Sequence, residues 1–134
     1  MKTVLDMGVE VYKLVNVPVL TNTISGGIYR NTRPADSDRE DIVVNTVTLG
    51  DGTRQHGIAN INIYAKDICV ARSNILLADT SRLKTLTELV KPLVEEIDGD
   101  GFALWLISTK LFSEPLINQH FMNLRIEVQM YNFT

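Results

Sequence analysis

Residues 57–67, Gly-Ile-Ala-Asn-Ile-Asn-Ile-Tyr-Ala-Lys-Asp, decide the fold that we expect for this chain. Four small or apolar residues alternate here with four polar ones: Ala59, Ile61, Ile63 and Ala65 against Asn60, Asn62, Tyr64 and Lys66. A period of two predicts a strand with one buried and one polar face. Asparagine is uncommon in strands, so this flat face of amides and a phenol is unusual. We expect it to lie against another protein, or to be covered by a helix of the same chain.

The composition is that of a globular protein. With 134 residues the chain can form one domain with a core, and it is too short for two ordinary domains, so we expect a single domain over residues 1–134. A net charge of −3 does not match the basic surface of a nucleic-acid binder. No apolar run approaches the roughly 20 residues that cross a bilayer. Asp6 interrupts the segment where a signal peptide would be apolar, which predicts an intracellular protein.

The first half of the chain predicts a helix followed by three strands. The helix covers residues 3–16 and ends at Pro18, and a linker covers residues 21–27. A short strand at 28–30, a polar loop at 31–41 and a β-branched strand at 42–49 follow. The turn signal at 50–53 predicts an antiparallel hairpin between strands 42–49 and 57–67. The loop 31–41 and the turn 50–56 hold few apolar anchors, so we expect them to be mobile.

The second half predicts one long helix and two strands. Residues 75–77, Ile-Leu-Leu, fit either a buried loop anchor or a helical turn. Helical spacing of apolar residues follows over 79–97, with Pro92 inside it and a glycine-rich stop at 98–101. The apolar run 102–107 predicts a strand covered on both faces, and 113–119 a connection. Alternation over 122–130 predicts a strand with one buried face.

These elements predict an α+β fold of order α-β-β-β-α-β-β. We expect a mostly antiparallel sheet of about five strands, with the N-terminal helix and the long helix packed on it. The apolar face of the last strand should lie under the long helix. The residues in that contact are Met122, Leu124, Ile126 and Val128 on the strand and Leu86, Leu89, Val90 and Leu93 on the helix.

No residue pattern predicts catalysis, a metal site or a cofactor. His56 and His120 have no partner at metal-ligand spacing, and we expect both to be solvated. Asp98 and Asp100 lack the twelve-residue pattern of a calcium loop. The single cysteine, Cys69, is expected to be a small buried or half-buried residue. We therefore expect that the chain is not an enzyme.

The polar loop and the polar strand face supply the candidate interface residues. Carboxylates and arginines alternate over 33–41, which is typical of solvated loop charge or of a loop that docks on a neighbouring subunit through ion pairs. The candidates are Arg33, Asp36, Asp38 and Arg39 from the loop, and Asn60, Asn62 and Tyr64 from the strand.

The order of short motifs resembles the small tail-terminator or tail-completion proteins of tailed bacteriophages and prophages. The motifs are Gly27-Ile28-Tyr29, Arg33-Pro34, Glu40-Asp41-Ile42-Val43-Val44 and Gly57-Ile58-Ala59-Asn60-Ile61-Asn62-Ile63-Tyr64. The asparagines at 60 and 62 depart from the usual pattern of that group. The resemblance implies a ring-forming structural subunit at the end of the tail tube or at the head–tail joint. It implies contacts with copies of itself and with tail or head-completion proteins, made in a bacterial host cytoplasm and carried in the virion.

Two other functions stay open from the sequence. A small bacterial α+β domain that binds a ligand or acts as an enzyme would be a monomer or dimer with an apolar pocket. An adaptor would bind a peptide by adding it to a sheet edge.

Overall fold

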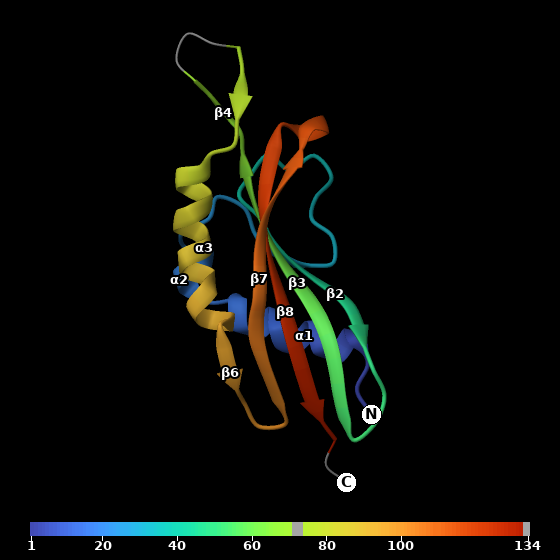
Figure 1. The fold of residues 1–134 in the computed structure, drawn as a ribbon. Coiled ribbons are helices and arrows are strands. Elements are labelled where there is room, and N and C mark those ends of the chain that lie inside the picture. Colours follow the sequence, from blue (N-terminus) through green and yellow to red (C-terminus); the bar gives the residue numbers. More distant parts are fainter. Residues whose placement is uncertain (71–73, 133–134) are drawn as a thin grey trace.

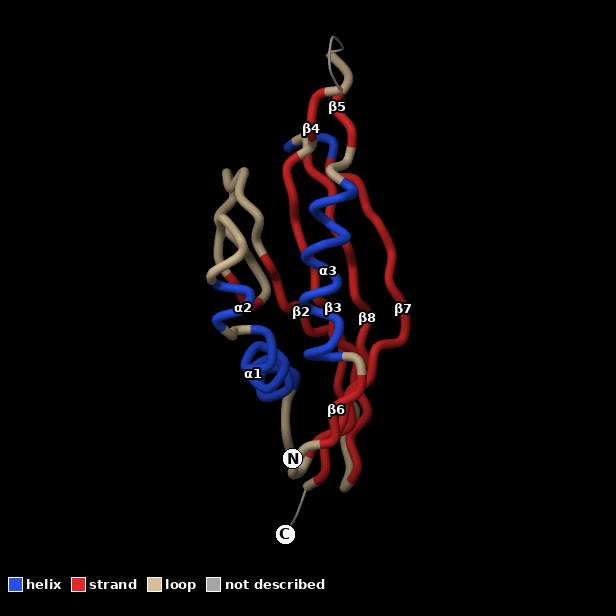
Figure 2. Tube along the Cα trace, turned by 90° about the vertical axis from the view of Figure 1, so that its left-hand side faces the viewer, coloured by secondary structure: helices blue, strands red, loops and turns tan. Residues whose placement is uncertain are grey.

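The computed structural model describes residues 1–70 and 74–132, which form an α+β fold of two layers (Figure 1). The helices are α1 (Val4–Val15), α2 (Pro18–Thr21) and α3 (Thr80–Val94), with a 3-10 helix η1 at Pro115–Ile117. The strands are β1 (Ile28–Arg30), β2 (Ile42–Leu49), β3 (Arg54–Lys66), β4 (Ile68–Cys69), β5 (Leu76–Leu77), β6 (Glu96–Asp98), β7 (Phe102–Glu114) and β8 (Gln119–Tyr131). The three α-helices lie on one side of the main sheet (Figure 2).

The main sheet has the strand order β1-β2-β3-β8-β7-β6, and β4 and β5 form a separate two-stranded ribbon. β1 runs parallel to β2, while all other neighbours are antiparallel. The expected sheet of about five strands was therefore too small, and the sheet is mixed. The stretch 57–67, which we expected to decide the fold, lies in a central strand: β3 pairs with β2 on one side and with β8 along its full length on the other. The predicted hairpin of β2 and β3 is confirmed.

The core lies between the sheet and the helices. Ala59, Ile61 and Ile63 of β3 are fully buried, as are Leu124, Ile126 and Val128 of β8. Leu86 and Val90 of α3 are fully buried in the same cluster, and Leu89 and Leu93 pack at its margin. The predicted contact of the long helix with the last strand is confirmed. Asp79 caps that helix, since its carboxylate accepts a hydrogen bond from the Arg82 N–H at 3.2 Å.

Helix α1 covers the apolar face over β2 and β3. Thr3 and Asp6 form a capping box at its start, and Met7, Val11 and Val15 are buried along one side. Gly57 allows this close approach, because a Cβ there would lie 2.7 Å from the Met7 sulfur. The alternative that this helix covers the polar face of β3 is therefore wrong.

Two predicted element ends differ from the structure. The first helix ends at Val15, and Pro18 begins α2 instead of ending α1; proline suits the first turn of a helix, where no N–H is needed. The long helix ends at Val94, not at residue 97, and β6 follows. The glycines at 98–101 therefore turn the chain from β6 into β7, and Gly101 adopts a φ of 86°.

The strand predicted at 102–107 is longer and more exposed than expected. β7 continues to Glu114, so the connection to β8 shrinks to η1 and its flanking residues. Leu104 is buried, but residues 107–113 are exposed, so β7 is not covered on both faces. Cys69, expected to be at least half-buried, is exposed on β4.

Candidate protein interface

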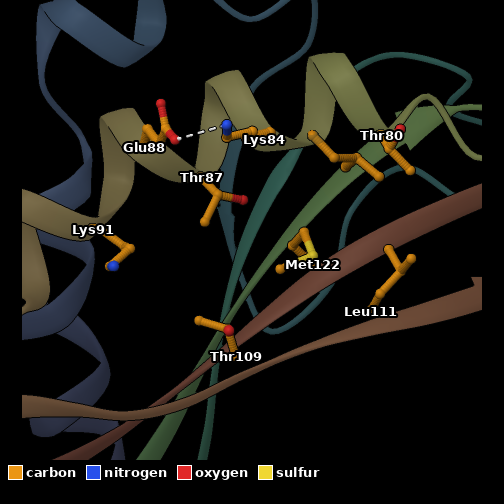
Figure 3. Close-up of a pocket in the computed structure, with 9 residues that line it drawn as sticks. Thr80, Lys84, Thr87, Glu88, Lys91, Thr109, Leu111 and Met122 are labelled. Carbon is orange, nitrogen blue, oxygen red and sulfur yellow. Dashed lines mark ion pairs between the residues drawn. The ribbon is translucent and has the colours of Figure 1, made fainter.

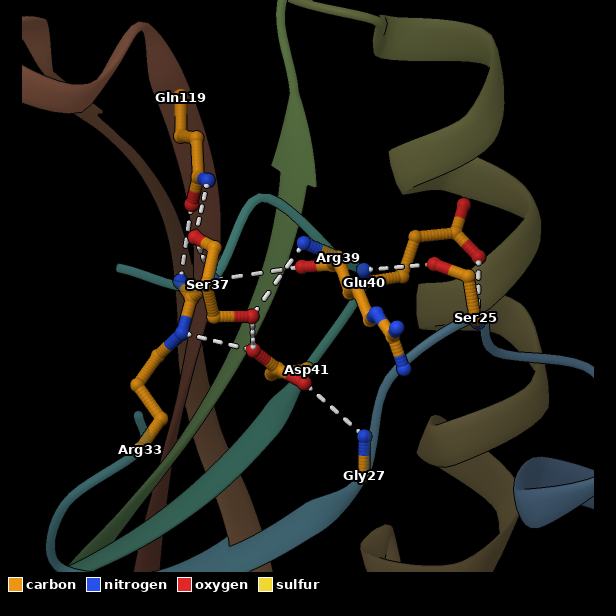
Figure 4. A network of polar contacts seen from close by, with 8 residues as sticks. All are labelled: Ser25, Gly27, Arg33, Ser37, Arg39, Glu40, Asp41 and Gln119. Atoms are coloured by element: carbon orange, nitrogen blue, oxygen red, sulfur yellow. Dashed lines mark hydrogen bonds and ion pairs between the residues drawn. The ribbon is translucent and has the colours of Figure 1, made fainter. Parts of the chain in front are cut away.

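A buried ion pair holds the polar loop 31–41 on the sheet. The Asp41 side chain is 1% exposed, and Arg33 Nε lies 2.8 Å from its Oδ2. The N–H does not point along that line, so the contact is an ion pair without the geometry of a hydrogen bond. The Ser37 hydroxyl donates to Asp41 Oδ2 at 2.5 Å, and the Gly27 N–H donates to Oδ1 at 2.9 Å (Figure 4). Asp41 therefore joins the loop to the start of β1.

Arg33 extends this network to β8 and β3. Its Nη1 donates to Gln119 Oε1 at 2.8 Å, and its Nη2 donates to the Ser37 carbonyl at 2.8 Å. The buried Gln119 also donates to the Ser37 carbonyl, at 2.8 Å. The guanidinium lies over the Tyr64 ring, 4.1 Å from its centre. The interpretation of the loop as solvated charge is therefore wrong for Arg33 and Asp41, and these contacts oppose the mobility expected there.

A second ion pair ties the same loop to α3. Arg82 donates to both carboxylate oxygens of Glu40 and to the Thr23 carbonyl. The hydrogen bond from Arg82 lowers the pKa of Glu40 below its usual value and raises that of Arg82. Ser25 adds a bond, because its Oγ accepts from the Glu40 N–H at 2.9 Å. Loop 31–41 is thus fixed at both the sheet and the helix.

The side chains on the polar face of β3 make most of their contacts within the chain. Asn62 is 7% exposed and accepts a hydrogen bond from Asn123 of β8 at 2.8 Å. The Tyr64 ring packs at a tilt against Phe121, with 4.8 Å between ring centres, and Phe121 in turn stacks on Phe112 at 5.1 Å. Burial raises the pKa of Tyr64. Asn60 is half-buried opposite Asn45 and Arg125. No described helix covers this face, and neighbouring strands and loop 31–41 bury these side chains instead.

The structure thus divides the seven candidate interface residues. Arg33, Asn62 and Tyr64 make intrachain contacts, and Asn60 is half-buried between neighbouring strands. Asp36, Asp38 and Arg39 are exposed on the loop and free to meet another protein.

The histidines take different environments. His56 is exposed and lies 3.8 Å from Glu127. His120 was expected to be solvated, but it is largely buried and its Nδ1 lies 2.6 Å from Asp67 Oδ1. Within residues 1–70 and 74–132, no three His, Cys, Asp or Glu side chains gather in a way that could hold a metal ion. None of the helices in this described part is long and apolar enough to cross a membrane.

A groove of about 300 Å³ lies between α3 and the outer part of the sheet (Figure 3). Its lining comes from α3 (Thr80, Leu83, Lys84, Thr87, Glu88 and Lys91), β7 (Thr109 and Leu111) and β8 (Met122). The Thr87 side chain is nearly buried, and its hydroxyl has no hydrogen-bond partner. The lining thus combines apolar side chains with threonines and the charged side chains of Lys84, Glu88 and Lys91.

Two exposed apolar regions were missed by the sequence analysis: the β4–β5 ribbon and the outer half of β7. The apolar run at 75–77 was the signal for the ribbon, and we read it as an anchor or a helical turn. Leu111 and Phe112 were the signal for the longer β7, but the polar residues Ser-Thr-Lys before them interrupt the apolar pattern, so the strand was not predicted.

The fold resembles that of a phage-like virion component. A chain in a solved structure described as "Virion of native gene transfer agent (GTA) particle" matches with a TM-score of 0.56 and 13% sequence identity. The match covers 91% of this chain and 92% of the other chain, so the two share the fold over most of their lengths. No protein-family model matches the sequence, and no curated protein matches it either.

Proposed function

We propose that the chain is a structural subunit of a phage or prophage tail, which forms a ring at the end of the tail tube or at the head–tail joint. The observation that carries this proposal is the fold shared along nearly the whole length with a chain of a gene transfer agent virion. The order of sequence motifs, with the resemblance to tail-terminator proteins, supports it independently.

The surface of the molecule supports a role in assembly. Large apolar side chains are exposed on the β4–β5 ribbon, on β7 and at Leu116 of η1, which is 95% exposed. Exposed apolar patches are typical of surfaces that contact other proteins. Its partners are copies of itself and other tail or head-completion proteins. It acts without a cofactor and without enzymatic activity, and it is made in the host cytoplasm and carried in the virion.

A ligand-binding domain is the second candidate, and the groove with its unpaired Thr87 hydroxyl is the observation that favours it. Its volume stands at the lower end of the range for small-molecule pockets. Native mass spectrometry and electron microscopy of the purified chain separate the two proposals. Closed rings of one defined size support the tail subunit, whereas a monomer at every concentration contradicts it.

A further inference from the structure

The outer half of β7 is an open sheet edge. β8 pairs with β7 along its whole length, but β6 pairs only with residues 103–105 (Figure 2). Among the described residues, no strand pairs with the outer side of 107–114. The one charge in 107–113 is Lys110, whose Nζ lies over the Phe112 ring at 4.9 Å. Soluble proteins usually shorten or charge such an edge, because its free backbone groups invite another strand.

The hydrogen-bond pattern shows which backbone groups are free. The Tyr64 N–H donates to the Asp41 carbonyl on the β2 side, so Tyr64 does not bond its partner Phe121 in β8. In an antiparallel sheet, successive residues of a strand direct their backbone N–H and C=O groups alternately to the two sides. Phe121 therefore bonds its partner Phe112 of β7. Along β7, the residues that alternate with Phe112 direct these groups away from β8. Thr109 and Leu111 therefore present their N–H and C=O groups to the open side.

The groove under α3 lies directly beside this edge. Thr109 and Leu111, whose backbones face outward, also line the groove with their side chains (Figure 3). A strand added at the edge would place every second side chain toward Leu83 and Met122, while its main chain bonds β7. Thr87 also lines this groove, although its unpaired hydroxyl is itself buried. The site thus fits an extended, apolar segment of polypeptide.

The β4–β5 ribbon, defined here by residues 68–70 and 74–77, has the properties of that segment. It projects beyond the end of the main sheet (Figures 1 and 2). Ile68 pairs with Leu77, and the two side chains are 47% and 48% exposed. None of its residues is charged. Two paired residues per strand stabilise a ribbon only marginally in water, so a surface that covers these side chains would add to its stability.

We propose that the open edge of β7, residues 107–114, together with the groove under α3, receives the β4–β5 ribbon of a second copy of this chain. This inference rests on the proposed function as a ring subunit. Ribbon and edge are different surfaces, so the contact is head-to-tail, and repetition closes a ring when the rotation permits. The described residues of the ribbon are uncharged. The groove offers Leu83, Leu111 and Met122 to them, beside the charged side chains of Lys84, Glu88 and Lys91. A contact with a second copy covers the apolar side chains of both surfaces without any further partner.

One variant on each surface tests the contact, with mass measured by light scattering and native mass spectrometry. Thr109→Pro removes the outward N–H and leaves the bonds to β8 intact, since proline is tolerated at an open edge. It should reduce the assembly to the 15.0 kDa of one chain. Thr109→Ala, which loses the side chain and keeps the N–H, should stay assembled. Leu77→Asp on the ribbon should also give single chains, whereas Leu5→Asp, at the exposed Leu5 of α1, should not.

A mixture of the two disrupted variants tests the head-to-tail geometry. Thr109→Pro keeps an intact ribbon and Leu77→Asp keeps an intact edge, so together they should form a complex of two chains and no ring. A circular-dichroism melt confirms that each variant is folded. If Thr109→Pro does not fold, a mixture of Leu77→Asp with wild type replaces this test. In that mixture Leu77→Asp should end each row of subunits and shorten the assembly. Variants that assemble like wild type, dissociation by either control, or a mixture without two-chain complexes would overturn this contact and leave the ring function standing. A wild-type chain that is monomeric at every concentration would overturn both.

Discussion

Replacing Asp41 by asparagine removes one charge from a buried ion pair and changes little else. The Gly27 N–H can still donate to the amide oxygen, and the Ser37 hydroxyl can turn to another acceptor. Arg33, whose side chain is 11% exposed, loses its counter-charge. Breaking one side of a buried pair costs about 3–5 kcal/mol. Because Arg33 keeps Gln119, the Ser37 carbonyl and the Tyr64 ring, we expect the lower end, about 3 kcal/mol.

Urea unfolding followed by the fluorescence of Trp105 measures this loss at a concentration where both proteins are monomeric. The midpoint should fall with an unchanged slope, and the thermal midpoint should fall by about 10 °C for a domain of this size. Asp38→Asn, an exposed carboxylate of the same loop, is the matched control and should stay within about 0.5 kcal/mol. An Asp41→Asn variant as stable as Asp38→Asn would refute the claim that this pair holds the loop.

Other variants test the core, the second ion pair and the polar face. Leu86→Ala should lower the free energy of unfolding, measured in urea, by roughly 2–5 kcal/mol, because Leu86 is fully buried. The control Leu116→Ala should change it little, since Leu116 is exposed. Equal losses would contradict the packing of α3. The hydrogen bond from Arg82 holds the pKa of Glu40 below its ordinary value of 4.5. The contribution of Glu40 to stability is therefore present above that pH and is lost as the pH falls through the folded pKa. Acid titration of Glu40→Gln should therefore show a weaker loss of stability below pH 4.5, and an unchanged profile would count against the bond to Arg82. Asn62→Lys should lower the free energy of unfolding by about 2 kcal/mol or more, because Asn62 is buried against β8. A changed oligomer with an unchanged melt would instead place this residue at a subunit contact. Chelator treatment should leave the thermal midpoint unchanged, and a drop of many degrees would reveal a structural metal.

The alternating and helical patterns were sufficient to predict most elements, because burial of one face imposes a period on the sequence. The strands at 57–67 and 122–130 and the apolar side of α3 followed directly from that period. The same physics failed for the outer half of β7. Its residues 107–113 are exposed on both faces, so no burial enforces an alternation there. β6 was missed because Ile97 continues the helical spacing, and only its pairing with Leu104 makes it a strand.

The candidate interface depended far more on tertiary structure. The sequence determined that residues 33–41 are rich in charge, but whether a carboxylate meets water or an arginine depends on what lies above it. Gln119 and Tyr64, both distant along the chain, and the nearer Gly27 convert Asp41 and Arg33 into a buried pair. By itself the sequence determined the α+β class, the central strand and the helix that packs on it, because these follow from local periods of hydrophobicity. Only the tertiary structure decided the mixed sheet, the open edge of β7 and the projecting ribbon, because strand order and exposed edges arise from pairings between residues far apart in sequence.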